Sequence, residues 1–342
     1  LALAASVAQA NEITYRFSNG EIVRVDTDDP NAPFRIDPAR PTKSIQTKNI
    51  VFNVTFDDVE QGTGIGFDDP INGEAFRDRV QDIFTYLDSV LDHDGTLDVL
   101  FDVSLNDPDD PTQASAGPGF PDGTGINNGS AFERLTTGVD PDPDFPEISA
   151  QVNFGYAWNA GTEPTPPGES DFFTLLLHEI THGLGMLGLV DEFGESGGLF
   201  TRWDVLMERG DGGRLVTVTD GVGTFVGEAA DLISDDLFFG GAMATAALGT
   251  PPALYAPDPY SEGTSISHFD DQKITGAGRF VMEPFGEEGV DIREYAAFEI
   301  GVLQDIGYMI DGIGGEGEGE GEGEGEGEGE GEGEGEGEGE GE

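Results

Sequence analysis

The segment HEITHGLGMLG, residues 178–188, constrains the fold more than any other stretch of the chain. His178 and His182 are four residues apart, and on an α-helix this spacing places both imidazoles on one face, where they can share a metal ion. Glu179 lies beside them and can reach a metal-bound water without being a ligand. The apolar run FFTLLL precedes the motif and predicts that the helix is buried. The chain is therefore expected to fold around a buried helix with a metal-binding face.

The residues before the motif predict the start of this helix and the elements around it. Ser170 is a suitable N-cap, and Asp171 would place negative charge in the first turn, where it complements the helix dipole. Alternating and helical apolar patterns predict further elements of one α/β domain. These are a strand at 49–56, an amphipathic helix at 76–91, a strand at 99–105, a loop at about 106–146 and a strand at 148–154.

The two ends of the chain differ in composition from its body. Residues 1–10, LALAASVAQA, are typical of the later part of a secretory signal peptide. Residues 11–48 are either a lead-in or a pro-segment. Residues 312–342 are a predicted disordered spacer, because most of this stretch is a plain Gly-Glu alternation with nothing apolar to bury. We therefore expect a secreted protein, or one tethered at the cell surface through sequence beyond the tail.

The net charge narrows the range of partners. It is −54, and it is still −40 without the 14 glutamates of the Gly-Glu alternation. Such a charge repels nucleic acid and anionic membranes and favours divalent cations. The chain has no cysteine, which excludes thiolate metal ligands and a disulfide framework. No apolar stretch of the mature chain is long enough to span a bilayer, so we expect a soluble monomer.

The residues after the motif resemble those of the metzincin metallopeptidases. Gly185 matches the glycine that follows the second His by three residues in that family, and it lets the chain leave the helix sharply. At the position of the family's third ligand, six residues after the second His, this chain has Gly188, which has no side chain to donate. The third ligand would therefore come from a more distant part of the chain.

A later part of the chain resembles the leishmanolysin-like branch of the metzincins, in which a large insertion precedes the third His. His268 occurs in SISHFDD, and Met282 follows in FVMEPFG, which is the order of third ligand and methionine turn in that branch. Residues 295–308, YAAFEIGVLQDIGY, are similar to its closing helix. Leishmanolysins are braced by disulfides, so this cysteine-free chain is more similar to a bacterial-type relative.

The resemblance covers roughly residues 145–310 and implies a fold of the α/β class. It would be an α+β zincin, metzincin-like, with a mixed twisted sheet, an active-site helix and a C-terminal subdomain that carries the third ligand and the methionine turn. The peptidase domain would span 49–311 with an insertion at about 189–262. The implied roles are zinc ligation by His178, His182 and His268, general base catalysis by Glu179, and structural support by Gly185 and Met282.

The third ligand has alternatives that the residues alone leave open. Three imidazoles suit zinc, which favours His268, whereas a thermolysin-type site would use a carboxylate from a later helix. His93, in the acidic segment DHDG, is more simply a loop residue. The candidate carboxylates are Asp191, Glu192, Asp204 and Glu208.

The expected chemistry is peptide hydrolysis by a secreted zinc endopeptidase acting on a protein or peptide substrate. Zinc with three protein ligands keeps a position for water and lowers its pKa, and Glu179 would take the proton and deliver it to the leaving amine. The strand at 148–154 is a candidate edge for pairing with an extended peptide, and an interior strand is the alternative. Tyr255 and Tyr260 could stabilise the oxyanion, although tyrosines in a Pro-rich loop more often pack at the surface.

A second cation is suggested by the acidic segment DHDGTLD. Asp92, Asp94 and Asp98 surround a glycine and offer the oxygen ligands that calcium accepts, but the full calcium-loop pattern is missing, and a solvated turn is the alternative. The rival function is a non-enzymatic, acidic, calcium-binding surface or matrix protein with a degenerate metal site. Glu179 discriminates between the two functions, because a purely structural site needs no carboxylate beside its first histidine.

Overall fold

The computed structural model describes residues 12–16, 22–26, 43–46, 49–121 and 123–311. The predicted signal-peptide remnant (1–10) and the predicted Gly-Glu spacer (312–342) lie outside these residues. Of the predicted lead-in, the described parts are three strands. β1 (Glu12–Arg16) pairs with β2 (Ile22–Asp26), and β3 (Lys43–Gln46) pairs with β4 (Ile50–Phe56).

The central element is a mixed five-stranded sheet in the order β3-β4-β5-β8-β6. β4, β5 (Gly95–Phe101) and β8 (Ile148–Val152) are parallel to one another, while β3 and β6 (Ala114–Pro118) are antiparallel to their neighbours. The prediction of an α/β domain with a mixed sheet is therefore confirmed. The strand predicted at 148–154 is interior, so its interpretation as an edge strand is wrong, and β6 occupies that edge.

The predicted loop at 106–146 is wrong in part, because it contains three elements: β6, β7 (Gly125–Ile126) and α3 (Ser130–Thr137). The sequence of β6, ASAGP, has no β-branched or aromatic residue and contains a glycine and a proline, all of which argue against a strand. Pairing with β8, in the register Ala116 opposite Ala150, makes it one. An edge strand needs only one partner, so tertiary context overrides its weak propensity.

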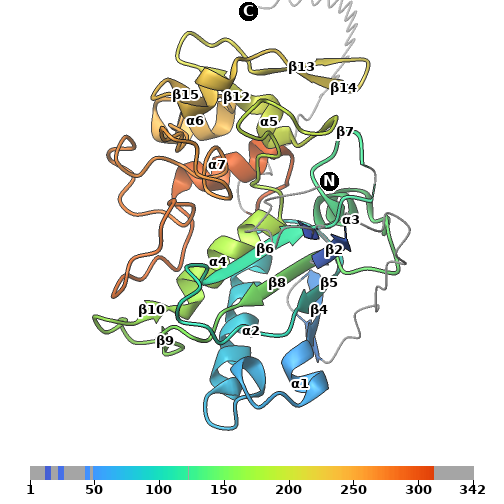
Figure 1. The fold of residues 1–342 in the computed structure, drawn as a ribbon, viewed down its shortest axis with the longest axis vertical. Coiled ribbons are helices and arrows are strands. Elements are labelled where there is room, and N and C mark those ends of the chain that lie inside the picture. Colours follow the sequence, from blue (N-terminus) through green and yellow to red (C-terminus); the bar gives the residue numbers. More distant parts are fainter. Residues whose placement is uncertain (1–11, 17–21, 27–42, 47–48, 122, 312–342) are drawn as a thin grey trace, which may run out of the picture. The chain divides into compact units, whose positions relative to one another are not determined.

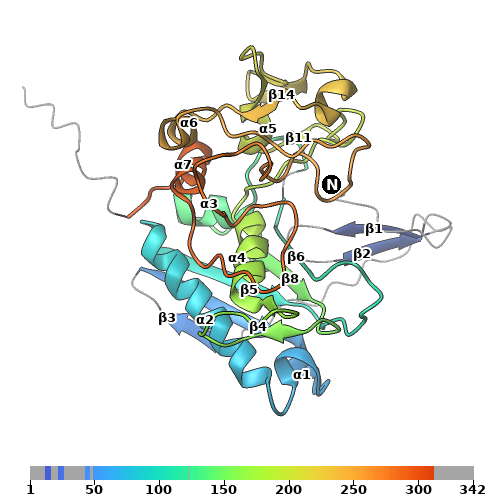
Figure 2. The same cartoon turned by 90° about the vertical axis from the view of Figure 1, so that its left-hand side faces the viewer.

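One long helix covers the sheet beside the motif helix. α2 (Gly73–Val90) connects the parallel strands β4 and β5, and its apolar face is buried as the helical spacing predicts. Phe84 of α2 stacks on Phe52 of β4 with ring centroids 4.3 Å apart. Between β4 and α2 lie α1 (Asp57–Gln61) and the short 3-10 helix η1 (Gly66–Asp68). α2 and α4 (Phe172–Gly183) pack against each other (Figure 2).

The motif helix α4 begins one residue later than predicted. Asp171, not Ser170, is its N-cap, and the Asp171 carboxylate accepts the Thr174 N–H at 3.0 Å. Ser170 belongs instead to β10 (Ser170–Asp171), which pairs with β9 (Trp158–Asn159). Arg293 donates to both Asp171 oxygens, at 2.9 and 2.6 Å, so the helix start is tied to a segment far along the chain. The buried cap and this ion pair fix the direction in which α4 leaves the sheet.

Residues 184–311 form most of the upper part of the described molecule in Figure 1. α7 (Ala297–Ile306) is the closing helix that the sequence predicts, and it packs closely on α6 (Ala242–Leu248) where Gly301 leaves no room for a side chain. None of the helices in the described ranges combines the length and apolarity that crossing a bilayer requires. The remaining elements are β11 (Leu199–Phe200), α5 (Arg202–Leu206), β12 (Met207–Arg209), β13 (Val216–Thr219), β14 (Val222–Phe225), η2 (Ala229–Ile233) and β15 (Leu237–Phe239).

Candidate metal centre

The structure brings His178, His182 and His268 together. The Nε2 atom of His268 lies 3.0 Å from that of His178 and 3.2 Å from that of His182. In the described part of the chain, these three residues form the group of His, Asp or Glu side chains whose geometry could hold a metal ion. The first two histidines come from α4, and the third comes from a segment 86 residues beyond His182. A buried histidine triad that could bind a metal is therefore part of the fold.

The hydrogen bonds of the three imidazoles define their protonation. Each Nδ1 faces a backbone carbonyl: Val281 O for His178 at 2.7 Å, Met186 O for His182 at 2.8 Å and Thr264 O for His268 at 2.7 Å. A carbonyl oxygen only accepts, so we assign the proton of each neutral ring to Nδ1 and leave Nε2 with its lone pair. Three lone pairs then converge with no proton between them. Such an arrangement is repulsive by itself and suits a cation.

Burial keeps the triad neutral. It lowers the pKa of His178 to about 4 and that of His182 to about 3, and it lowers the pKa of His268 well below the usual value. Mutual repulsion between the rings adds to the effect of burial for His182 and His268. Neutral imidazole is the form that ligates metals, so the site needs no deprotonation at neutral pH.

Glu179 connects the motif helix to the edge of the sheet. Its side chain is nearly buried, at 9% exposure, and its Oε2 accepts the backbone N–H of Ala116 at 3.0 Å. That N–H belongs to β6, so the carboxylate beside the first histidine touches the outer edge of the sheet. Sequence reasoning missed this contact, because β6 was expected to be a loop.

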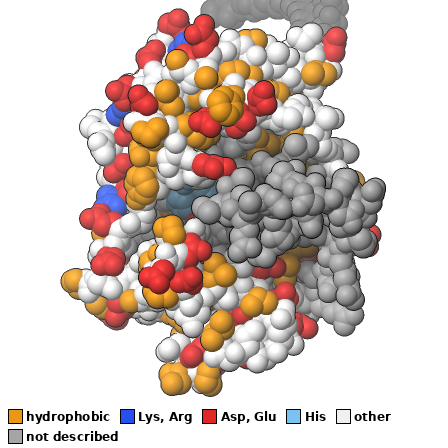
Figure 3. All heavy atoms as spheres, in the orientation of Figure 1, with side chains coloured by type: hydrophobic (Ala, Val, Ile, Leu, Met, Phe, Trp, Pro, Cys, Tyr) orange, Lys and Arg blue, Asp and Glu red, His pale blue; other side chains and the backbone are white. Residues whose placement is uncertain are grey.

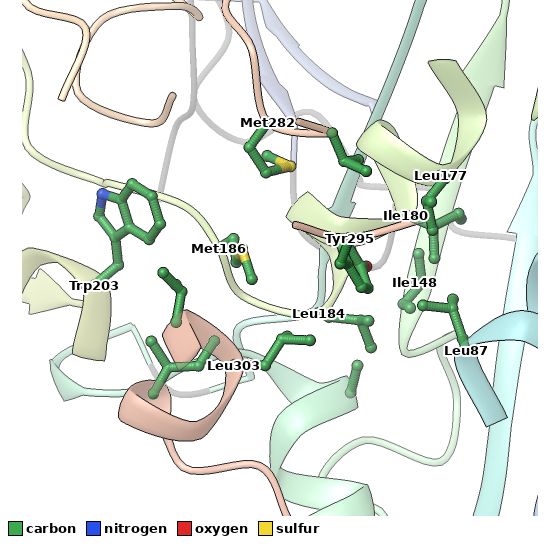
Figure 4. Close-up of a cluster of buried hydrophobic side chains, with 14 of the residues drawn as sticks. Leu87, Ile148, Leu177, Ile180, Leu184, Met186, Trp203, Met282, Tyr295 and Leu303 are labelled. Carbon is green, nitrogen blue, oxygen red and sulfur yellow. The ribbon is translucent and has the colours of Figure 1, made fainter. Parts of the chain in front are cut away.

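A turn at Val281 and Met282 supports the triad from one side. The Val281 carbonyl orients His178, and Met282 O accepts the N–H of Phe269, the residue after His268. Met282 is fully buried, in the same cluster as Met186 (Figure 4). The turn that contains Met282 therefore contacts the side chain of His178 and the backbone next to His268.

The carboxylate of Glu299 holds this turn. It accepts the N–H groups of Met282 at 2.7 Å, Val281 at 3.2 Å and Ala296 at 2.8 Å, and burial raises its pKa to about 7. Sequence reasoning missed this role of Glu299. A signal was present, since Glu299 is an acidic residue within the otherwise apolar stretch AFEIGVL of α7.

Gly185 and Gly188 shape the exit from the helix. Gly185 has φ +95°, and a Cβ there would lie 2.3 Å from Asn128 Nδ2, so both conformation and space require glycine. The Gly188 N–H donates to Ser267 Oγ at 3.1 Å, and Ser267 Oγ lies 3.4 Å from the Gly188 carbonyl. Gly188 thus bonds through its backbone to the residue that precedes His268.

The other candidate ligands lie elsewhere in local hydrogen bonds. The buried Asp204 forms a capping box with Thr201 and accepts the Leu189 N–H. Glu208 forms an ion pair with Arg214. Asp191 accepts N–H groups of its own loop. Glu192 is exposed. His93 lies in a loop, as expected. His93 is buried, and its Nε2 accepts the Met309 N–H at 3.0 Å.

The side chains of the two candidate tyrosines, Tyr255 and Tyr260, make contacts with residues outside the triad. The Tyr260 hydroxyl donates to Val190 O at 3.1 Å, and the Tyr255 ring packs against Phe285 with centroids 5.5 Å apart. The candidate calcium ligands Asp92, Asp94 and Asp98 do not form a ligand group in the described residues. Asp98 accepts instead from the side chain of Asn53 at 2.8 Å.

The surface around the site is hollowed and acidic. Figure 3 shows histidine atoms in a recess of one face, with acidic side chains around it. His178 is the triad member that is partly exposed, whereas His182 and His268 are buried. Comparison of the chain with models of known families, with curated proteins and with solved structures found no match.

Proposed function

We propose that the protein is a secreted zinc endopeptidase of the metzincin type, in its leishmanolysin-like branch. The observation that carries the proposal is the convergence of three bare Nε2 atoms next to a carboxylate that is not a ligand. The two Nε2 separations, 3.0 and 3.2 Å, are close to the roughly 3.3 Å expected between ligand atoms about 2.05 Å from a tetrahedral zinc ion. Soft metals prefer thiolate or thioether ligands, and hard metals such as calcium and magnesium prefer oxygen ligands, so neither class favours three imidazoles.

The chemistry follows from the ligand set and from Glu179. His178, His182 and His268 would hold zinc, which when bound would activate a water molecule and polarise the scissile carbonyl. Glu179, one residue after the first ligand, accepts the proton and returns it to the leaving amine. Its hydrogen bond with Ala116 holds the carboxylate at the sheet edge. An extended substrate that pairs with β6 would therefore pass beside the general base.

The rival function, an acidic calcium-binding matrix protein, has less support. Its predicted calcium ligands do not assemble in the described residues, and it gives no role to Glu179. The triad is also complete without a ligand at Gly188, which removes the reason for regarding the metal site as degenerate.

The decisive experiment compares zinc content and casein hydrolysis in the wild type, Glu179→Gln and His268→Ala. Glu179→Gln should keep zinc and lose hydrolysis by about 10²–10⁴-fold, because only the proton transfer is removed. His268→Ala should lose both zinc and hydrolysis. His93→Gln is the matched control, since it removes a buried histidine outside the triad and should keep zinc.

The proposal has clear contrary results. A wild-type protein that binds no zinc and cleaves no peptide would refute it. So would hydrolysis at the wild-type rate in Glu179→Gln. A His268→Ala variant with full zinc content and full activity would refute the ligand assignment.

A further inference from the structure

The chain just before the third ligand adopts an unfavourable backbone conformation. Ile266 has φ +61°, in the left-handed region, and it is one of two residues other than glycine with positive φ in the described ranges. This region is disfavoured for an L-residue by roughly tenfold in population, and a β-branched side chain makes it a genuine outlier. Ile266 is also buried, at 1% exposure, so solvent exposure does not explain the conformation. Something else must hold Ile266 in place.

Two hydrogen bonds hold the peptide groups of Ile266. The indole Nε1–H of Trp203 donates to the Ile266 carbonyl at 2.8 Å, and the Ile266 N–H donates to Tyr255 O at 2.8 Å. Trp203 is itself held by packing, since it is fully buried and contacts both Phe239 and Phe269, with ring centroids 4.9 and 5.1 Å away. We call Trp203, Ile266 and Tyr255 the Ile266 clamp.

The clamp determines the path of the next two residues. Ser267 turns toward the motif exit and bonds to the backbone of Gly188, and the backbone carbonyl of His268 accepts the Tyr255 N–H at 2.9 Å. His268 then bonds through Nδ1 to Thr264 O and presents Nε2 to the other two histidines. If Ile266 relaxed to the β region, the chain direction after it would change. The His268 side chain would then leave the triad.

We infer that Trp203 is a positioning residue of the metal centre, whose indole N–H holds Ile266 in the left-handed conformation that presents His268 as third ligand. This inference rests on the metal centre of the proposed function. It adds the contacts that hold His268, which is distant in the sequence, beside the other two histidines. Trp203 lies within the predicted insertion at about 189–262 and His268 follows it, so the clamp ties the inserted segment to the segment that carries the third histidine.

The first test is Trp203→Phe, which keeps the aromatic packing and removes the N–H donor. Zinc affinity is measured by competition with a chromophoric chelator, which requires no peptidase activity. We expect binding about tenfold weaker than in the wild type, the size of one unfavourable backbone conformation. Far-UV and near-UV circular dichroism report whether the variant folds. An affinity equal to that of the wild type would overturn the inference.

The second test isolates the backbone conformation of Ile266. Ile266→Gly and Ile266→Ala are introduced separately into the Trp203→Phe protein, and they leave nearly the same cavity. Glycine adopts positive φ readily and alanine does not. We expect the glycine variant to bind zinc about tenfold more tightly than the alanine variant. Equal affinities, or tighter binding by the alanine variant, would overturn the inference.

A stability measurement covers the case in which Trp203→Phe does not fold. In the otherwise unchanged chain, Ile266→Gly should unfold at a higher urea concentration than Ile266→Ala, the reverse of the usual order of these residues. The usual order would contradict the clamp. Zinc binding without hydrolysis in the wild type would contradict the proposed function and leave the clamp tests valid, whereas a wild type that binds no zinc would overturn both.

Discussion

Gly188 shows how neighbouring residues decide the role of a single position. A Cβ at Gly188 would lie 3.1 Å from Ile266 Cδ1 and 3.3 Å from Asp204 Oδ1. A side chain at this position would therefore press on Ile266, in the segment that brings His268, and on Asp204. Glycine avoids both close contacts.

Glu147 leads to a prediction about pH. It is 1% exposed and accepts the Asp98 N–H at 2.6 Å and Arg134 Nη1 at 3.0 Å, and burial raises its pKa from 4.5 to about 7. A carboxyl whose folded pKa is raised stabilises the fold fully below its unfolded pKa, and this contribution is lost as the pH rises through about 7. The wild type should therefore lose stability between pH 5 and pH 8 because of this group.

Glu147→Gln should remove that part of the pH dependence. Between pH 5 and pH 8, the free energy of unfolding of the wild type should fall more than that of the variant. We expect the difference between the two decreases to be about 2–3 kcal/mol. Urea unfolding at four pH values measures this difference, and effects of other groups cancel in the comparison. Glu74→Gln, at an exposed position in the first turn of α2, is the control and should follow the wild type. Parallel curves for Glu147→Gln and the wild type would contradict the prediction.

At the scale of elements, regular patterns were predictable and the sheet edge was not. α2 and α4 follow from apolar residues at helical spacing, and β4 and β8 follow from alternation, because in each case the signal lies within the element. The strand predicted at 99–105 is right only in part, because β5 spans 95–101 and begins four residues earlier. β6 has no such signal, since its structure depends on the pairing with β8. The N-cap of α4 was misplaced by one residue, because Ser170 and Asp171 are both good caps and Arg293 favours Asp171.

β6 gives a prediction about substrate binding. The N–H of Ala116 points away from β8 toward Glu179, and strand alternation places the N–H of Ala114 on the same side. Ala116→Pro removes the N–H donor to Glu179, the proposed general base, so hydrolysis should fall at least about tenfold while zinc content stays unchanged. Ala114→Pro is the matched control and should have a smaller effect, because its N–H lies farther along the edge. Equal effects of the two variants on hydrolysis would contradict this assignment of the edge.

At the scale of the whole molecule, the acidic charge is not balanced by free cations in the part that the structure describes. Of the nine Lys and Arg residues in 49–121 and 123–311, seven form ion pairs with carboxylates. The other two, Arg77 and Arg202, bond to backbone carbonyls. The whole chain has 69 acidic residues against 15 basic ones, so its charge of −54 is an excess of carboxylates. Such a surface repels itself in the folded state.

Salt should consequently stabilise this protein. Raising NaCl from about 20 to 200 mM shortens the Debye length from roughly 20 to 7 Å, and we expect the unfolding temperature to rise by about 2–5 °C. Differential scanning calorimetry measures the shift, with sucrose of equal osmolality as the control for solvent exclusion. An unchanged or lower unfolding temperature in salt would show that ion pairs outweigh the repulsion.

The sequence by itself determined the local half of the candidate site. His178, Glu179 and His182 share one helix, and helix geometry alone places their side chains relative to one another. Only the tertiary structure decided the third ligand, the edge strand that contacts Glu179, and the buried Trp203 and Glu299 that hold the ligand segments. These contacts join residues far apart in the chain, and their formation depends on how the whole core packs. No spacing rule within one element can specify them.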